Sequence, residues 1–287
     1  MKIGFNLLLW TSHVERQHWP ILADLKACGY DGVEIPIFEG TPAHYAELGK
    51  ELDRLGLERT VIALFPTTET DPIGADAAQR QAALDHMNWI LECSAALGAA
   101  TVGGPLHSAL GHFSGVAPTA AERARGVAFH REAGEIARRH GIIIALEALN
   151  RFECYFLNTM ADLASYLAEV GHPNVLGMYD TFHANIEEKD PVAAIHAIAP
   201  HLGHVHVSEN DRGTPGKGHI DFAATFAALR KVDYDGWITI EAFGRALPPL
   251  AAATRVWRDL SPTPTEVYID GFKLIRDGWH GGARTVG

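Results

Sequence analysis

The sequence predicts a closed (β/α)8 TIM barrel, and three observations lead to this fold class. Eight short apolar runs rich in β-branched residues alternate with longer stretches of helical period, which is typical of βα units around a parallel sheet. The chain has 287 residues, a length that accommodates eight such units. It contains no Pro/Ser-rich linker and no shift in composition. We therefore expect one barrel domain over residues 1–287 rather than a doubly wound open sheet.

The expected strands account for the apolar runs in chain order. They begin near Ile3, Gly32, Leu57, Ala100, Ile142, Val175, Leu202 and Trp237. The first run is interrupted by Asn6 and is followed by no small-residue cleavage site, which indicates a strand rather than a signal peptide. No G-x-G-x-x-G follows this run, and its absence disfavours a dinucleotide-binding sheet.

The stretches between the strands carry the end signals of helices. Thr119 and Glu122 form a T-x-x-E capping box, Thr159 begins a T-x-x-D variant, and Pro42 suits a first helical turn. Glycine favours a left-handed helix C-cap and stands just before five strands, at Gly29, Gly56, Gly98, Gly141 and Gly171. We expect a last helix over residues 263–279 that packs on the barrel, and a loose tail over residues 280–287.

Charge and cysteine content exclude several classes of protein. The chain carries 24 Lys and Arg against 35 Asp and Glu, a formal net charge of −11. Proteins that bind nucleic acid or anionic membranes need a basic surface, so neither partner is expected. No apolar run approaches the ~18 residues of a membrane span. Cys28, Cys93 and Cys154 are widely spaced and odd in number, which indicates a cytoplasmic protein rather than a disulfide framework.

Chemistry is expected at the C-terminal ends of the strands, where barrels of this kind carry their active sites. The fifth strand ends in Glu147, the sixth in Asp180 and the eighth in Glu241, while the seventh carries His206. Three converging carboxylates would repel one another, and a divalent cation resolves that conflict. Each residue alone is more often a solvated loop residue, but four on consecutive strands predict a metal site. Three oxygen ligands and one nitrogen suit Mn²⁺, Mg²⁺ or Co²⁺.

The histidines need sorting, because the chain has 16 of them. His204 and His206 are two residues apart on one strand, so either could reach the metal. His206 lies nearer the strand end, and we expect His204 one layer deeper. His107 either lines the pocket or caps a loop. Six others fall in or beside helical stretches and are expected to face solvent: His18, His44, His86, His130, His140 and His196.

Polar residues follow strands five to seven in the expected loops. They are Asn150, Arg151, Glu153, His183, Glu209 and Arg212. Such residues supply the directional donors and acceptors that a hydroxyl-rich ligand needs, although an ordinary charged loop has the same composition. The glycine-rich run 213–218 has one lysine and no G-K-S/T signature, so it indicates a rigid turn rather than a phosphate cradle.

Four stretches carry a resemblance to a known family: IALEALNRFECYFLNT, MYDTFHANIEE, GHVHVSENDRGTPGKGHIDF and WITIEAF followed by VWRDL. They resemble the ketose 3-epimerases of the D-tagatose and D-psicose (allulose) type, which belong to the xylose-isomerase-like sugar isomerase/epimerase barrels. The opening MKIGFNLLLW and the segment TVGGPLHS extend the likeness over most of the chain.

The resemblance implies a set of site residues. It implies one divalent metal, usually Mn²⁺ with Co²⁺ or Mg²⁺ as substitutes, bound by Glu147, Asp180, His206 and Glu241. It further implies that Glu147 and Glu241 are the two acid/base residues, and that the substrate is held near O1 to O3 by Glu153, His183 and Arg212. A homodimer or homotetramer is also implied.

The residues and the resemblance lead to the same reaction. Epimerising the carbon beside a carbonyl requires a proton to leave one face and another to arrive on the opposite face, so two bases must flank the sugar. The expected activity is a metal-dependent 3-epimerisation of non-phosphorylated ketoses, such as D-fructose/D-psicose, D-tagatose/D-sorbose or L-ribulose/L-xylulose, through a cis-enediolate. The alternative is another sugar or polyol isomerase of the same barrel group, of the aldose–ketose, inosose or hydroxypyruvate type.

Two alternative functions are disfavoured, and the chain differs from the family pattern at four positions. The acidic charge disfavours a DNA-repair endonuclease, and the two-base arrangement disfavours a non-catalytic sugar-binding barrel. The chain departs from the family pattern where aromatic residues are common, with Asn6 and Leu8 in the first loop and Ala109 and Leu110 after LHS. We expect these four positions to face the far end of the sugar.

Overall fold

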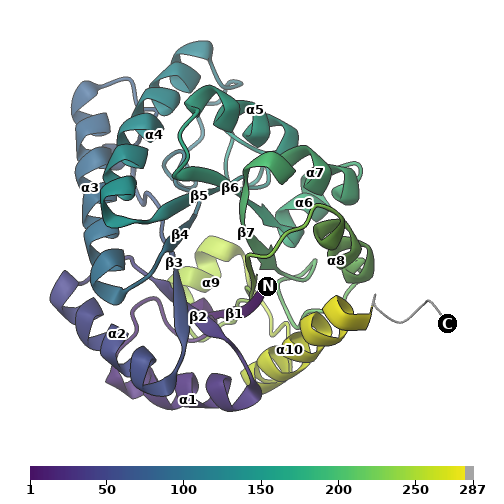
Figure 1. Cartoon of the computed structure of the whole chain (residues 1–287). Coiled ribbons are helices and arrows are strands. Elements are labelled where there is room, and N and C mark those ends of the chain that lie inside the picture. The colour runs from purple at the N-terminus through teal and green to yellow at the C-terminus, as the bar shows by residue number, and fades with distance from the viewer. Residues whose placement is uncertain (282–287) are drawn as a thin grey trace.

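The structure, a computed structural model that describes residues 1–281, is a closed barrel of parallel strands in sequence order (Figure 1). The strands are β1 (Lys2–Asn6), β2 (Gly32–Pro36), β3 (Glu58–Ile62), β4 (Thr101–Gly104), β5 (Ile143–Glu147), β6 (Val175–Asp180), β7 (Leu202–Val207) and β8 (Trp237–Ile240). Pairing of β8 with β1 closes the ring, with Phe5 opposite Ile240. The predicted fold class is therefore confirmed, and each strand begins within one residue of its expected start.

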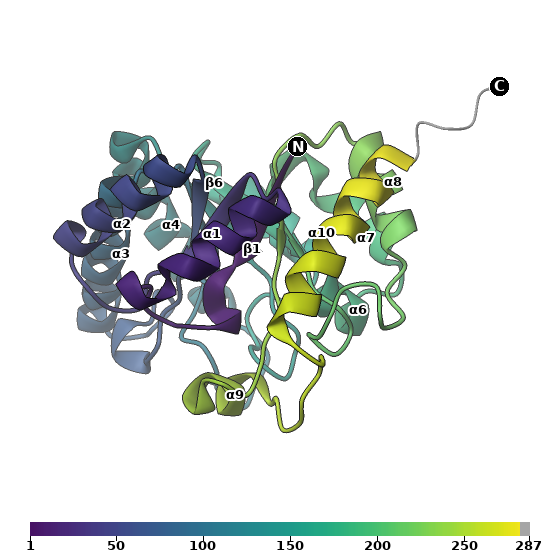
Figure 2. The ribbon, with the colours of Figure 1, turned by 90° about the horizontal axis from the view of Figure 1, so that it is seen from below.

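Helices surround the barrel on its outer face, except α9 (Pro248–Thr254), which lies at one end (Figure 1 and Figure 2). They are α1 (Trp19–Cys28), α2 (Pro42–Leu55), α3 (Ala77–Leu97), α4 (Ala120–His140), α5 (Met160–Val170), α6 (Thr181–Glu187), α7 (Pro191–Ile198), α8 (Phe222–Lys231), α9 (Pro248–Thr254) and α10 (Pro264–Gly281). The expected capping box between Thr119 and Glu122 is formed at the start of α4. The five glycines that precede strands all have positive φ, as a left-handed cap requires.

The C-terminal helix is longer than predicted. His280 and Gly281 belong to α10, so the expected tail was wrong for these two residues, because the helical hydrogen bonding continues past Trp279. Residues 282–287 of the expected tail lie outside the described residues. Among residues 1–281, no helix is both long and apolar enough to cross a membrane.

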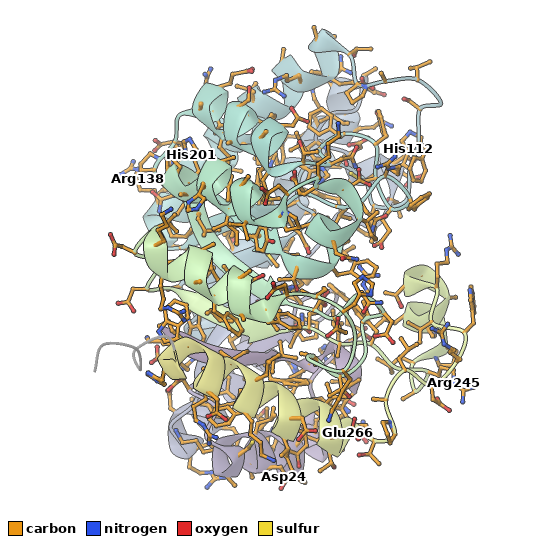
Figure 3. The ribbon with its side chains drawn as sticks, turned by 90° about the vertical axis from the view of Figure 1, so that its right-hand side faces the viewer. Asp24, His112, Arg138, His201, Arg245 and Glu266 are labelled. Carbon is orange, nitrogen blue, oxygen red and sulfur yellow. The ribbon has the colours of Figure 1, made fainter. Side chains whose placement is uncertain are left out.

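The two ends of the barrel differ in what they carry. Figure 3 shows Arg138 and His201, which precede strands, at one end, and His112 and Arg245, which follow strands, at the other. The short helix α9 lies at this second end, opposite the N-terminus (Figure 2). Viewed down the barrel it lies across the opening (Figure 1). The C-terminal ends of the strands therefore lie at the end of the barrel where α9 is found.

Alternation along the strands separates an apolar layer from a polar interior. Val205 and Val207 of β7 belong to the large apolar cluster that the strands share with the helices. Because side chains alternate along a strand, His204 and His206 point to the opposite face, into the barrel. Glu34 of β2 and Thr60 of β3 are also buried and point into the barrel, because Glu34 contacts His204 and His206, and Thr60 donates to Glu34. The barrel interior therefore contains ionisable groups near its C-terminal end.

Candidate active site

Four predicted metal ligands meet at the C-terminal end of the barrel. Glu147 and Asp180 are the last residues of β5 and β6, His206 lies in β7, and Glu241 directly follows β8. One nitrogen or oxygen atom from each side chain lies within 4.8 Å of the corresponding atoms of the other three. All four residues are buried. The four side chains that the sequence places at or near consecutive strand ends therefore form one compact cluster.

Two of the atoms that face one another in this cluster lack hydrogen-bond partners among the described residues. His206 Nδ1 is 3.6 Å from Asp180 Oδ2 and 3.6 Å from Glu241 Oε1, which is too long for a hydrogen bond. Among the described residues, neither His206 Nδ1 nor Asp180 Oδ2 has any other partner. Buried polar atoms are rarely left unpaired, and a cation between them would satisfy both. The residues therefore fit a divalent metal.

Asp180 is held in place by the start of the next helix. Its Oδ1 accepts hydrogen bonds from the backbone N–H groups of Phe182 (2.6 Å) and His183 (3.0 Å), so it is the N-cap of α6. Using one oxygen as a cap fixes the carboxylate plane and leaves Oδ2 facing the cluster. Asp180 in the D-T-F-H segment is therefore both a predicted metal ligand and the N-cap of α6.

The electrostatics of the cluster also favour a cation. Burial and the charges of Glu241 and Asp180 raise the pKa of Glu147 well above its ordinary value. Burial, opposed by His206 and reinforced by Asp180, raises the pKa of Glu241 to about 7. Burial alone would lower the pKa of His206, but the carboxylates of Glu34 and Glu241 outweigh it and raise that pKa well above its ordinary value. The carboxylates repel one another, and a bound divalent ion would remove this repulsion.

Glu153, His183 and Arg212 lie beside the cluster. Arg212 Nη1 is 3.1 Å from Glu153 Oε1, and the guanidinium stacks 4.0 Å from the ring centroid of Phe182. His183 Nδ1 accepts the backbone N–H of Asn150 at 3.0 Å. The Asn150 side-chain Nδ2 also lies 3.0 Å from this Nδ1, so the neutral ring carries its proton on Nε2, 3.5 Å from Glu147 Oε1; Arg212 Nη2, 3.3 Å from Nε2, is then a second donor beside this N–H and not its hydrogen-bond partner. The structure thus brings together a guanidinium, a carboxylate and an imidazole N–H next to the four predicted metal ligands.

Two other polar loop residues have local roles. Arg151 is exposed and pairs with Glu187 at 2.9 Å. Glu209 is buried and accepts backbone N–H groups from its own loop, including Gly216 at 2.8 Å and Ile220 at 3.2 Å. Because the carboxylate of Glu209 occupies these donors, the glycine-rich run 213–218 has the bonding of a rigid turn.

A cavity of about 590 Å³ connects the cluster with the solvent at the α9 end. Its inner end is polar and is lined by Asn150 and by five predicted site residues, Glu147, Glu153, His183, Arg212 and Glu241. The remaining wall is largely apolar and includes Leu8, Phe38, Ile62, Leu110, Phe113, Phe152, Phe243 and Leu250. Asp180 and His206 are not among its lining residues, so a ligand in the cavity would approach the four-residue cluster from the side of the two glutamates.

Of the four positions expected to face the far end of the sugar, two line the cavity and two are buried away from it. Leu8 and Leu110 line the apolar wall, whereas Ala109 is buried with its N–H directed to Asp71 Oδ1 at 3.3 Å. Asn6 is fully buried under the cluster, where its amide contacts Glu34 and Glu241. As the last residue of β1, Asn6 points into the barrel interior and cannot face a loop-bound group.

Sequence reasoning missed Glu34 and misplaced one histidine. Glu34 is fully buried and contacts both His204 and His206; a charged residue inside the apolar run GVEIP was the available signal. His130 was expected to face solvent but is fully buried, and its ring nitrogens contact the Tyr166 hydroxyl (2.7 Å) and the Leu106 carbonyl (2.9 Å). His130 lies on the face of α4 that packs toward the barrel, where each of its ring nitrogens has a partner.

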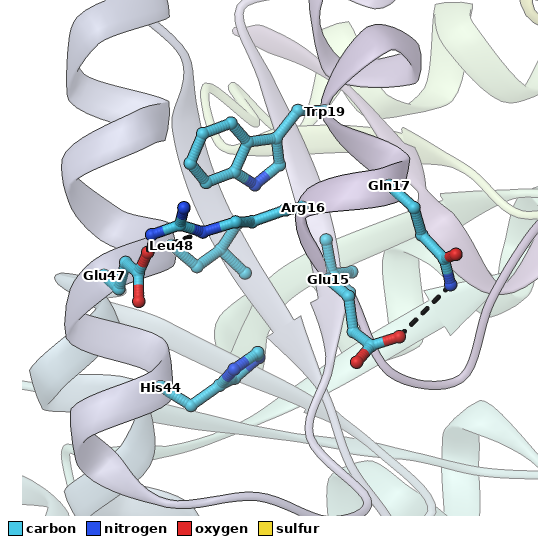
Figure 4. A pocket seen from close by; sticks show the side chains of 8 residues that line it. Glu15, Arg16, Gln17, Trp19, His44, Glu47 and Leu48 are labelled. Atoms are coloured by element: carbon cyan, nitrogen blue, oxygen red, sulfur yellow. Dashed lines mark hydrogen bonds and ion pairs between the residues drawn. The ribbon is translucent and has the colours of Figure 1, made fainter.

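A second hollow lies between the segment around residue 16 and α2 (Figure 4). Its volume is about 340 Å³. Four exposed polar side chains at its edge pair with one another: Arg16 with Glu47, and Gln17, whose amide donates to Glu15 at 3.1 Å. Among the described residues that line this hollow, the carboxylates are exposed and no cluster of buried carboxylates converges on it, so we assign the chemistry to the barrel-end cavity.

The fold and the cluster define a class: a barrel enzyme whose site is formed at the C-terminal ends of its strands. A family model described as xylose isomerase-like TIM barrel matches residues 22–276. The D-psicose 3-epimerase of Agrobacterium fabrum is 33% identical over 265 residues, which cover 91% of each chain. The L-ribulose 3-epimerase of a Methylomonas species is 34% identical over 268 residues, again 91% of each chain.

A solved structure of an L-ribulose 3-epimerase superposes on the barrel with a TM-score of 0.92 at 30% identity, covering 99% of this chain and 96% of that chain. The chain belongs to the xylose isomerase-like TIM barrel family, and its predicted resemblance to the ketose 3-epimerases of that family is confirmed. It is therefore an isomerase of the epimerase kind.

Proposed function

We propose that this protein is a reversible, metal-dependent ketose 3-epimerase that acts on non-phosphorylated sugars. The observation that carries the proposal is that Glu147 and Glu241 belong to two arrangements at once. Each is a member of the four-residue cluster that could hold a metal, and each lines the cavity above that cluster. The proposed metal is Mn²⁺, with Co²⁺ or Mg²⁺ as substitutes, because oxygen-rich donor sets with one imidazole suit these ions. Its proposed ligands are Glu147, Asp180, His206 and Glu241.

The two glutamates are proposed to move the proton at C3 of the ketose. A divalent cation at this position would polarise the C2 carbonyl and stabilise negative charge on its oxygen. One glutamate carboxylate takes the C3 proton, and the electron pair of the broken C–H bond forms the double bond of a cis-enediolate. The other glutamate gives a proton to the opposite face of C3 and regenerates the C2 carbonyl. In the reverse direction Glu147 and Glu241 exchange roles.

Three further residues are proposed to hold the sugar near O1 to O3. Arg212 offers guanidinium donors whose direction is fixed by Glu153 and by stacking on Phe182. His183 offers the N–H on Nε2, because its Nδ1 is occupied by a backbone donor. Burial lowers the pKa of His183 to about 4, so the imidazole is neutral at pH 7 and acts as a hydrogen-bond donor. Glu153 supplies an acceptor for a sugar hydroxyl.

The names of relatives support the substrate class. The curated relatives include D-psicose and L-ribulose 3-epimerases, so the proposed pairs are D-fructose/D-psicose, D-tagatose/D-sorbose and L-ribulose/L-xylulose. The test is turnover of this panel by metal-stripped protein reloaded with Mn²⁺, Co²⁺ or Mg²⁺. Conversion of a ketose to its C3 epimer only after reloading supports the proposal. Accumulation of an aldose or a polyol ketone instead would favour the alternative isomerases of the same barrel group.

We also infer a cytoplasmic homodimer or homotetramer whose partners are small sugars rather than nucleic acid or membranes. Free cysteines support a reducing compartment, and a net charge of −11 opposes binding to polyanions. The exposed apolar side chains of Phe152 and Trp257 support contact with a second copy. Light scattering of the purified protein distinguishes these assemblies from a monomer.

A further inference from the structure

A buried carboxylate lies directly beneath the four proposed metal ligands. Glu34 of β2 is fully buried and receives four hydrogen bonds. On Oε1 it accepts from Thr60 Oγ1 (2.9 Å) and His204 Nε2 (2.8 Å). On Oε2 it accepts from Asn6 Nδ2 (2.9 Å) and His206 Nε2 (2.6 Å). Two donors on each oxygen fill the acceptor capacity of a carboxylate, so Glu34 has no free position for another partner.

This arrangement determines which nitrogen of His206 carries the proton. A carboxylate only accepts hydrogen bonds, so the Nε2 atom that faces Glu34 Oε2 must be an N–H donor. A histidine that binds a metal must be neutral and then has a single N–H, so with the proton on Nε2 the Nδ1 atom presents its lone pair to the cluster. Nδ1 is the atom 3.6 Å from Asp180 Oδ2 and Glu241 Oε1, with no partner in the described part of the chain.

The same carboxylate is linked to a proposed acid/base residue through Asn6. The Asn6 side-chain oxygen accepts the backbone N–H of Leu8 at 2.9 Å, which sets the direction of the amide. Its Nδ2 group then faces two carboxylates, Glu34 Oε2 at 2.9 Å and Glu241 Oε1 at 3.3 Å. An uncharged amide with two N–H groups is one of the few side chains that can separate two buried carboxylates without adding charge.

We propose that Glu34 is a positioning residue: it fixes His206 as the Nε2–H tautomer, so that His206 binds the metal through Nδ1, and through Asn6 it also holds Glu241. The inference rests on the metal site of the proposed function. Hydrogen bonds from a ligating imidazole to a carboxylate orient the ring and raise its basicity, and losing such a partner typically costs about 10–100-fold in metal affinity. A barrel-stabilising role alone would leave metal affinity unchanged in a folded variant.

Glu34→Gln tests the inference because it keeps size and shape. Glutamine offers one oxygen and one NH2 group where Glu34 offers two oxygens, so one pair of donors loses its acceptor, and the remaining acceptor is uncharged. Thr60→Val is the matched control: it removes one donor to Oε1 in the same buried layer and leaves both contacts of Oε2 in place. Mn²⁺ affinity is measured by titration with detection of free Mn²⁺ by electron paramagnetic resonance.

We expect Glu34→Gln to weaken Mn²⁺ binding about 10–100-fold and Thr60→Val to change it far less. Equal affinities for the two variants would overturn the positioning role. Nitrogen NMR of the unsubstituted, Mg²⁺-loaded protein with ¹⁵N-labelled histidine gives an answer even if Glu34→Gln does not fold. A proton on His206 Nε2 is expected, and a proton on Nδ1 would contradict the inference. A protein that binds no Mn²⁺ at all would overturn the proposed metal site itself.

Discussion

Asp180→Asn separates the metal-binding role of Asp180 from its structural role. Oδ1 caps α6 through two backbone N–H groups, whereas Oδ2 faces His206 without a hydrogen bond. An asparagine keeps an oxygen for the cap and places an NH2 group where Oδ2 stood. Because an amide nitrogen with two hydrogens has no lone pair for a metal, the variant should fold and lose metal binding.

The magnitude follows from linkage between binding and folding. A ligand at about 100 times its dissociation constant stabilises the folded state by about 2.7 kcal/mol. For a chain of this size each kcal/mol shifts the melting temperature by about 2–4 °C. Mn²⁺ should therefore raise the melting temperature of the unsubstituted protein by about 5–10 °C relative to protein in EDTA. Asp180→Asn should show almost none of this rise.

The assay is thermal unfolding followed by circular dichroism with EDTA and with Mn²⁺. Asp190→Asn is the matched control, since Asp190 caps α7 through Oδ1 at 3.0 Å from two backbone N–H groups, is exposed and does not belong to the cluster. This control should keep the full metal-induced rise. Asp180→Asn with the same rise as Asp190→Asn would refute the assignment of Asp180 as a ligand.

Three further predictions test other parts of the site. Glu147→Gln and Glu241→Gln should each reduce the rate of epimerisation by about 10²–10⁴-fold, the usual contribution of an acid/base group. The control Glu132→Gln, which changes an exposed glutamate, should leave the rate unchanged. Near-normal turnover by either of the first two variants would contradict the two-base mechanism. Arg212→Lys should lower kcat/KM about 10–100-fold, because a charged hydrogen bond contributes about 1.5–3 kcal/mol and lysine cannot stack as a guanidinium does; unchanged steady-state kinetics on the best ketose would count against it. Burial lowers the pKa of His130 to about 4 from about 6.5 in the unfolded chain, so the folded state is favoured fully above pH 6.5 and loses stability as the pH falls toward 4. His130→Gln should make the urea-unfolding free energy less dependent on pH in this range, by up to about 1.4 kcal/mol per pH unit, and an unchanged slope would contradict it.

Local patterns predicted the parts of the site that depend on strand ends. Glu147, Asp180 and Glu241 each interrupt an apolar run at its C-terminal end, and barrel closure brings such ends to one rim. The preference for His206 over His204 rested on its position nearer the strand end and on the family resemblance, because alternation places both side chains on the same face of the strand. These residues could be found because their neighbours in sequence also decide where they lie.

Residues whose partners are distant in sequence could not be found in this way. Glu34 contacts His206, 172 positions further along the chain, and Asn6 contacts Glu241, 235 positions away. Alternation places both side chains inside the barrel but does not say which groups from the opposite strands meet them. His130 shows the same limit for a helix, because its buried face depends on the loop that supplies the Leu106 carbonyl.

The most direct test of the central claim is the position of deuterium after reaction in D2O. Mn²⁺-loaded protein is incubated with D-fructose or L-ribulose, and the recovered sugars are analysed by NMR. The account predicts deuterium at C3 of the ketose and of its C3 epimer, and none when the metal is removed. Deuterium at C1 with formation of an aldose, or exchange at C3 that persists without metal, would contradict it.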